Sequence, residues 1–121
     1  MRIAVVSNDF QTVTPHAGRS QRFLVFEAEP GQVPREVQRL ELPQSHILQS
    51  FKGNRPHPLG TVRAVIAGSA GPGVIARLKE RGIATAITTE PDPKTAIRLY
   101  LAGSLPAASW DDDDLPAPCD D

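Results

Sequence analysis

The chain is nearly free of cysteine: Cys119 is the only one among its 121 residues. A lone cysteine excludes a disulfide framework and a cysteine-rich zinc site, and it is typical of a protein kept in a reducing cytoplasm. Long apolar runs are missing as well, since no stretch approaches the ~20 residues that cross a membrane. The apolar run at residues 3–6 is also too short for the core of a signal peptide. We therefore expect a cytoplasmic protein with no membrane partner.

Net charge is small too, at −1, but it is unevenly distributed. Six of the 14 acidic residues lie between Asp111 and Asp121, so residues 1–108 hold the other eight together with all 13 basic ones, a balance of +5. A basic body favours an anionic partner such as a nucleic acid, a nucleotide or an anionic metal cluster. Surface charge placed for solubility explains the same balance equally well. Charge alone therefore leaves both interpretations open.

The end of the chain has little to bury. Residues 106–121 combine three prolines with six aspartates, a composition that predicts a disordered acidic tail. Trp110 is an exception, because its large apolar side chain can hold the start of the tail against the folded body. Residues 1–105 are then expected to form one domain, large enough to fold without a disulfide or a metal.

The first half of this domain is predicted to form an antiparallel meander of three strands. Residues 3–6 are continuously apolar, as in a strand covered on both faces. Residues 22–29 are rich in aromatic and branched side chains, and residues 37–42 alternate as a third strand. Pro34 places that strand at an edge, because proline cannot donate to a strand ladder. Residues 46–51 are predicted as a short helix.

The second half of the domain is predicted to form a strand, a helix, a strand and a helix, in that order. Residues 62–67 and 83–88 are the strands, and the helix between them requires them to be parallel. The residues predicted to begin or end the helices are Pro72 and Gly82 for the first, and Asp92 and Gly103 for the second. The whole pattern predicts an α/β fold with a mixed sheet of about five strands flanked by helices.

A glycine-rich segment at residues 68–73 follows a predicted strand and opens a helix. Backbone N–H groups in this position bind anions readily. The segment is not a P-loop, because no Lys-Ser/Thr pair follows it, and the spacing of Gly68, Gly71 and Gly73 is not the dinucleotide fingerprint. A tight turn explains the same glycines, and the pattern by itself favours the turn over an anion site.

His16 follows the first strand and is a candidate metal ligand. Gly18 lets the backbone approach a bound group closely. Arg19 and Arg22 place positive charge nearby. A neutral imidazole ligates iron or molybdenum, and guanidinium groups suit the anionic sulfides or carboxylates of a cluster. Taken alone, however, a histidine in a turn is more often an ordinary surface residue.

The remaining candidates are weaker. His46 and His57 have no spacing with His16 that matches a known ligand motif, so a three-histidine site is disfavoured, and Cys119 is predicted to be a bystander. Asp9 follows the first strand, where a Mg²⁺-dependent nuclease would need a carboxylate, but the strand at residues 62–67 supplies no second one.

Two separated runs, matching in order and spacing, carry a family resemblance. They comprise residues 2–9, 13–19 and 23–26, and later residues 64–68, 71–72, 78–79, 82–83 and 96–105. On these residues the chain resembles the NifX/NafY-type family of dinitrogenase iron–molybdenum cofactor biosynthesis, which also includes the C-terminal domain of NifB. The resemblance implies a ribonuclease H-like α/β fold.

The resemblance also implies a function without catalysis: binding or carrying the iron–molybdenum cofactor, or an iron–sulfur precursor cluster. The partner would be a nitrogenase cofactor assembly scaffold or apo-dinitrogenase, and no nucleic acid. His16 stands where the family has its ligand candidate, and Ala17 stands where the family usually has phenylalanine, which implies a more open or less shielded site. The residues expected around the cluster are His16, Gly18, Arg19, Arg22, Gly68 and Gly71.

Two other functions remain open from the residues. The chain could be a protein-interaction module that engages a basic partner through its acidic tail. It could also be a ribonuclease H-like, metal-dependent nuclease built around Asp9, although its carboxylate set looks incomplete.

Overall fold

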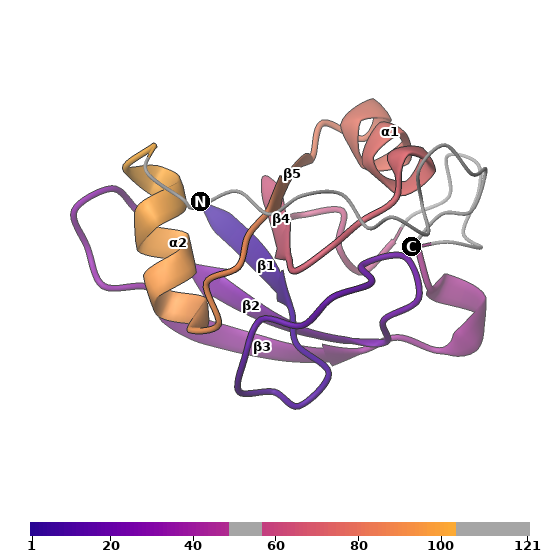
Figure 1. The fold of residues 1–121 in the computed structure, drawn as a ribbon, viewed down its shortest axis with the longest axis horizontal. Coiled ribbons are helices and arrows are strands. Elements are labelled where there is room, and N and C mark those ends of the chain that lie inside the picture. Colours follow the sequence, from indigo (N-terminus) through magenta and orange to yellow (C-terminus); the bar gives the residue numbers. More distant parts are fainter. Residues whose placement is uncertain (49–56, 104–121) are drawn as a thin grey trace.

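The structure is a computed structural model that describes residues 1–48 and 57–103. One mixed five-stranded sheet forms its centre (Figure 1). The strands are β1 (Arg2–Val6), β2 (Arg22–Glu27), β3 (Arg35–Glu41), β4 (Ala64–Ala67) and β5 (Ala84–Ile87), in the order β3-β2-β1-β4-β5. β2 is antiparallel to β1 and to β3, whereas β4 is parallel to β1 and to β5. The predicted meander followed by parallel strands is thus confirmed.

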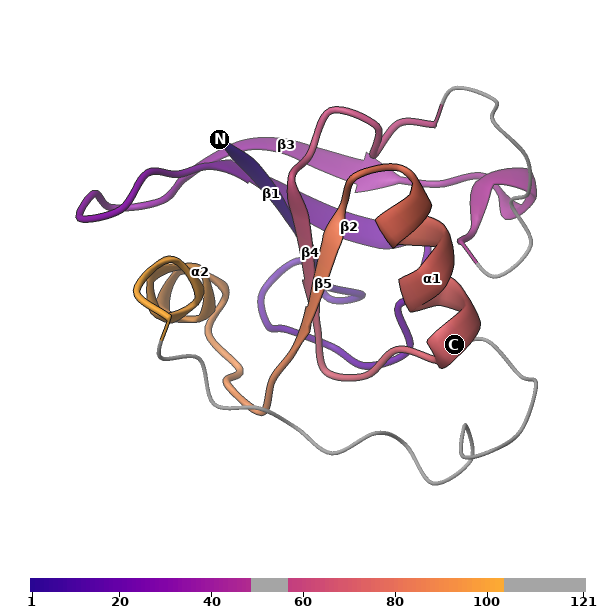
Figure 2. The same cartoon turned by 90° about the horizontal axis from the view of Figure 1, so that it is seen from above.

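Two helices cover the opposite faces of this sheet (Figure 2). They are α1 (Pro72–Glu80) and α2 (Pro93–Leu101). Central strand β1 contributes to both cores: Ala4 and Val6 pack in the cluster that contains α1, while Ile3 and Val5 pack in the cluster that contains α2. Burial on both faces explains why β1 is apolar without alternation.

The ends of α1 follow the predicted signals. Pro72 occupies the first turn, where its missing N–H costs nothing. Gly82 has φ +76°, a backbone conformation that glycine adopts without strain. The N–H groups of Gly82 and Ile83 donate to the carbonyls of Lys79 and Leu78, both at 2.9 Å. This pair of bonds is a Schellman motif, and it turns the chain directly into β5.

α2 likewise begins and ends where the sequence predicts. Asp92 caps it by accepting a hydrogen bond from the backbone N–H of Thr95 at 2.8 Å. Ala96 and Ile97 are fully buried against the sheet. Gly103 has φ +75° and ends the helix.

Some boundaries differ from the prediction. β4 starts at Ala64, two residues later than expected, because the N–H of Val62 donates to Leu59 within a turn at 3.2 Å. The predicted helix at residues 46–51 is instead a single 3-10 turn, η1 (Gln44–His46), as far as the described residues go. Residues 49–56, the acidic tail, Trp110 and Cys119 lie outside the described residues. Edge strand β3 is exposed along almost its whole length, as Pro34 indicated.

His57 is fixed in the packing beside η1. Its Nδ1 accepts the N–H of Leu59 at 3.0 Å, so the ring proton is on Nε2, which lies 2.7 Å from the carbonyl oxygen of His46. Burial lowers the pKa of His57, and the positive charges of Arg81 and His46 act in the same direction. The neutral ring is therefore the form that the fold stabilises.

Stability should consequently fall at mildly acidic pH. The unfolded chain binds a proton on His57 near its ordinary pKa of 6.5, while the folded chain resists it. Stability is therefore complete above that pH and declines as the pH drops below it, by at most about 1.4 kcal/mol per pH unit for one proton. Urea unfolding at a series of pH values measures this slope.

The matched variants separate His57 from the other histidines. His57→Phe should be less stable at every pH because it loses two hydrogen bonds, but its profile should be flatter between about pH 5 and pH 7. His46→Gln keeps the backbone carbonyl that His57 contacts and removes only the smallest cause that lowers its pKa, so most of the wild-type slope should remain. A slope that survives His57→Phe unchanged would contradict this assignment.

Candidate functional site

The parallel strands β1, β4 and β5 all end at one edge of the sheet. Ligands of open α/β sheets commonly bind in the crevice outside the carboxyl ends of such strands. Three connections meet there: residues 7–21 after β1, residues 68–71 after β4, and residues 88–92 after β5. This edge is the candidate site.

Backbone hydrogen bonds tie the loop of residues 7–21 to both other connections. The N–H of Thr14 donates to the carbonyl of Val6 at 2.9 Å, and the N–H of Gly68 donates to the carbonyl of Thr14 at 3.0 Å. The N–H of Val13 donates to the carbonyl of Pro91 at 2.8 Å. The loop is therefore held across the ends of all three parallel strands.

His16 lies where this loop meets the turn after β4. Its N–H donates to the hydroxyl of Ser69 at 2.8 Å, and the N–H of Ala17 donates to the carbonyl of Ser69 at 3.0 Å. The carbonyl of His16 accepts the hydroxyl of Ser20 at 2.8 Å. His16 has φ +67°, which is uncommon for a residue with a side chain and persists where surrounding contacts fix it. Hydrogen bonds at both its N–H and its carbonyl thus position the backbone of His16.

Gly68 makes this contact sterically possible. A Cβ built on Gly68 would lie 3.1 Å from the backbone nitrogen of Pro15 and 3.2 Å from its Cα. The prediction treated Gly68 as part of a turn or an anion-binding loop. The structure adds a third reason for glycine here, which is the close approach of the loop that carries His16.

The two candidate arginines have different surroundings. Nη2 of Arg19 lies 3.4 Å from Nδ1 of His16, so this guanidinium is beside the imidazole. Arg22 instead donates to the carbonyl of Asn8 at 3.2 Å, and its Nε lies 3.7 Å from a carboxylate oxygen of Glu41. Its guanidinium also stacks over the ring of Phe10, 5.4 Å from the centroid.

The candidate glycines are placed near His16 by the chain itself. Gly71 is the N-cap of α1, two residues after Ser69, and it supplies no side-chain cap. No acidic residue occupies the first turn of α1. Gly18 is buried within the loop. Of this turn, Ser69 contacts His16 directly, and Gly68 and Gly71 flank it in the sequence.

Ala17 has a different role from the one its sequence position suggested. Its side chain is completely buried in the core cluster beneath α1, together with Phe23, Leu42 and Val74. A larger side chain at this position would enter the core.

Asp9 stabilises the start of the loop. One carboxylate oxygen accepts the N–H groups of Gln11 and Thr12 at 2.9 and 2.8 Å, and the other accepts the Thr12 hydroxyl at 2.7 Å. The hydroxyl of Ser7 is 3.2 Å away. These bonds, the backbone N–H of Thr12 first, hold the pKa of Asp9 well below its usual range. Both oxygens of Asp9 are thus engaged in shaping a turn.

Within residues 1–48 and 57–103, no three side chains of His, Cys, Asp or Glu lie close enough together to hold a metal ion. His46 and His57 pack against each other, with ring centroids 5.8 Å apart. Both ring nitrogens of His57 are already in hydrogen bonds. In the described part of the chain, a three-histidine site therefore does not form. No helix in that part is long and apolar enough to cross a bilayer.

Ser69, Asn8 and Ser20 hold the loop but carry no strong sequence signal of doing so. The side chain of Asn8 donates to the hydroxyl of Ser20 at 3.1 Å, and the backbone N–H of Asn8 donates to the hydroxyl of Thr14 at 3.0 Å. Small polar residues in loops usually serve local turns. Their long-range partners become visible only in the folded chain.

Comparison with known proteins identifies the family. Residues 1–103 match the family model described as dinitrogenase iron-molybdenum cofactor. The chain belongs to this family. The family resemblance predicted from the two separated runs of residues is therefore confirmed. No curated protein sequence matches the chain at a significant level.

Solved structures with the same fold are only distantly similar in sequence. PH0822 has a TM-score of 0.69 and 21% identity, over 89% of this chain and 96% of that one. The apo form of the orange protein from Desulfovibrio gigas has a TM-score of 0.61 and 21% identity, over 90% and 93%. A NifB-like protein of the DUF35 family from Thermotoga has a TM-score of 0.55 and 20% identity, over 88% and 91%. At these identities the likeness shows that this chain shares their fold, and no more.

Proposed function

We propose that this protein binds or carries the iron–molybdenum cofactor, or an iron–sulfur precursor cluster, without catalysing a reaction. The family match over residues 1–103 is the observation that carries the proposal. The position of His16 supports it, because hydrogen bonds to its N–H and its carbonyl hold this residue at the edge where three parallel strands end.

The residues around His16 fit an anionic cluster as cargo. His16 supplies one imidazole ligand for iron or molybdenum. The guanidinium of Arg19 lies 3.4 Å from the ring and offsets negative charge on the cluster. The first turn of α1 adds backbone N–H groups with no acidic residue among them. A single protein ligand assisted by charge suits a group that is bound and later handed on.

The same proposal includes a fold superfamily, a partner and a cellular location. The strand order β3-β2-β1-β4-β5, with β2 antiparallel, supports a ribonuclease H-like assignment. The partner would be a nitrogenase cofactor assembly scaffold or apo-dinitrogenase, in the cytoplasm. Engagement of both Asp9 oxygens in a turn supports a binding role over a nuclease.

Retention of isolated cofactor tests the proposal. The purified protein is mixed anaerobically with iron–molybdenum cofactor, passed over a sizing column and analysed for iron and molybdenum. We expect the wild type to retain both metals. His16→Asn should retain at least about tenfold less, since losing even an outer-shell partner of a ligand costs 10–100-fold in metal affinity.

The variants are chosen so that the backbone survives. Asparagine tolerates the left-handed conformation of His16 better than other residues. His46→Gln removes a histidine far along the chain and should retain cofactor like the wild type. Equal retention by His16→Asn would remove His16 as a ligand. No retention by the wild type would overturn the carrier role and leave the interaction module.

A further inference from the structure

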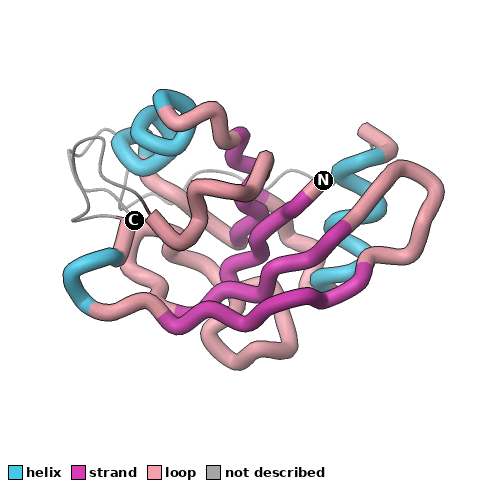
Figure 3. The backbone as a smooth tube through the Cα atoms, turned by 180° about the vertical axis from the view of Figure 1, so that it is seen from behind, coloured by secondary structure: helices cyan, strands magenta, loops and turns pink. Residues whose placement is uncertain are grey.

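A groove lies near the opposite ends of the strands from His16. The turn of residues 28–34, which joins β2 to β3, runs beside α2 (Figures 1 and 3). A groove of about 550 Å³ separates them, within the size range of ligand pockets. The residues that line it include Glu29, Val33, Thr95, Arg98, Leu99 and Ala102.

Apolar side chains lie on both sides of the groove. Val33 is 71% exposed, and with Val37 it is one of the large apolar side chains that the described part of the chain leaves exposed. α2 turns Ala96 and Ile97 toward the sheet, while Leu99 lines the groove. The apolar surface of α2 thus extends beyond the part that the sheet covers.

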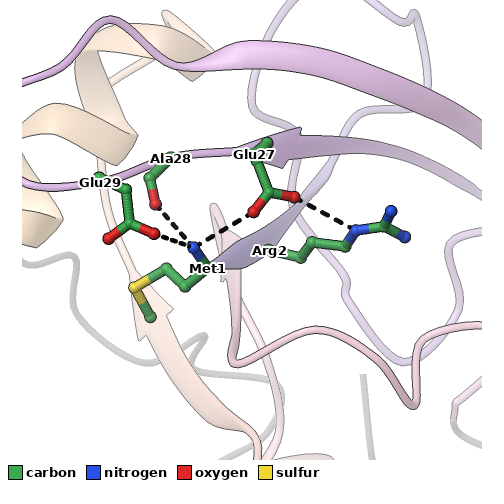
Figure 4. Close-up of polar contacts among 5 residues, drawn as sticks. All are labelled: Met1, Arg2, Glu27, Ala28 and Glu29. Atoms are coloured by element: carbon green, nitrogen blue, oxygen red, sulfur yellow. Dashed lines mark hydrogen bonds and ion pairs between the residues drawn. The ribbon is translucent and has the colours of Figure 1, made fainter.

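Charge around the groove is predominantly positive. Arg98 lines it, and Lys94 lies one helical turn earlier on α2. Glu29 is the acidic member, but its carboxylate contacts the amino group of Met1 at 2.5 Å (Figure 4). Glu27 lies 3.4 Å from the same amino group. With Glu29 engaged in this way, the groove presents apolar surface next to the basic side chains of Arg98 and Lys94.

We propose that this groove binds the chain's own C-terminal segment, with Trp110 in the hollow and the aspartates at residues 111–114 against Arg98 and Lys94. The segment has the matching order of chemistry: apolar Leu105 and Trp110 come first, and the four acids follow directly. An indole buries roughly 200 Å² and is the largest apolar group the segment offers.

The C-terminal segment begins next to the groove, so it is the part of the chain most readily available to fill it. Ala102 lines the groove, and residue 104 follows two positions later. Trp110 is seven residues beyond Gly103, so an extended chain reaches up to ~23 Å. Folding back along α2 from Ala102 to Thr95, the far lining residue, takes only about 10 Å. The segment is long enough to reverse direction and reach the whole groove.

Trp110 provides its own probe, because it is the only tryptophan of the chain. We expect its fluorescence in the full-length protein to be shifted to shorter wavelength, and its quenching by acrylamide to be several-fold slower than in the urea-unfolded chain. Val33→Asp places a charge in the groove at an exposed position and should restore fast quenching. Arg98→Glu should do the same by repelling the aspartates.

Val37→Asp is the matched control, since Val37 is an exposed valine on β3 outside the groove lining. It should leave Trp110 as protected as in the wild type. Fast quenching in the wild type would overturn the proposal, as would protection that survives Val33→Asp. Protection that grows with protein concentration would show the tail of a second copy in the groove, which also overturns it. None of these outcomes depends on cofactor binding at His16.

Discussion

Replacing Ala17 with phenylalanine should lower the free energy of unfolding by about 2–3 kcal/mol. The side chain of Ala17 is completely buried, and it packs in the same cluster as Phe23 and Val74. A close-packed core has no space for an added aromatic ring, so neighbouring side chains must leave their preferred rotamers. The loop cannot swing out freely either, because the N–H of Ala17 is bonded to the carbonyl of Ser69 at 3.0 Å.

Urea unfolding of Ala17→Phe against the wild type measures this loss. Ala76→Phe is the matched control, since Ala76 lies exposed on α1. There the same substitution should cost only the small difference in helix propensity, below about 0.7 kcal/mol. Equal stability of wild type and Ala17→Phe would mean that the loop of residues 7–21 can rearrange, and would contradict the fixed position assigned to His16.

The structure changes the meaning of this departure from the family pattern. From the sequence, alanine beside His16 indicated a more open site. In the fold, neighbouring residues of the loop point to different surroundings: His16 is half-buried at the edge, whereas Ala17 is buried in the core. Position 17 therefore acts on the site through the packing that supports it.

The elements of the fold were predictable because their signals are local. The continuous apolar run of β1, the cap at Asp92 and the glycine after α1 each act within a few residues. The start of β4 was not predictable in the same way. Whether Val62 pairs in the sheet or closes a turn with Leu59 depends on competing hydrogen bonds, while its apolar character suits both.

The candidate site was predictable by residue type but not by contact. Histidine and arginine at positions 16 and 19 indicated binding chemistry, and they do lie together. The bond from the N–H of His16 to Ser69 joins residues 53 apart in the sequence, which no local pattern encodes. The contacts of Arg22 were equally unpredictable. Its neighbours Phe10 and Glu41 come from a loop and a strand that only the fold brings together.

Gly68→Val should be the most damaging single change at the candidate site, with a loss of about 3 kcal/mol in the free energy of unfolding, and Gly68→Ala should lose about 1–2 kcal/mol. The added Cβ would meet backbone atoms of Pro15 at 3.1–3.2 Å, and backbone cannot move aside as a flexible side chain can. Displacing this backbone also stretches the bonds from Gly68 to Thr14 and from His16 to Ser69.

Two opposing effects act on Gly68→Ala, and the sign of its change in the free energy of unfolding shows which one is larger. Gly68 does not have a positive φ, the conformation that favours glycine, so replacing it would ordinarily stabilise the protein by about 0.4–1 kcal/mol through the unfolded chain. The steric contact with Pro15 must exceed this gain if the loop is seated as the structure has it. Urea unfolding gives the sign, and amide hydrogen exchange at His16 and Ala17 reports the loosened loop directly. Stabilisation by Gly68→Ala, with unchanged exchange at His16, would mean that the loop does not rest on Gly68. The position of His16 would then need another support.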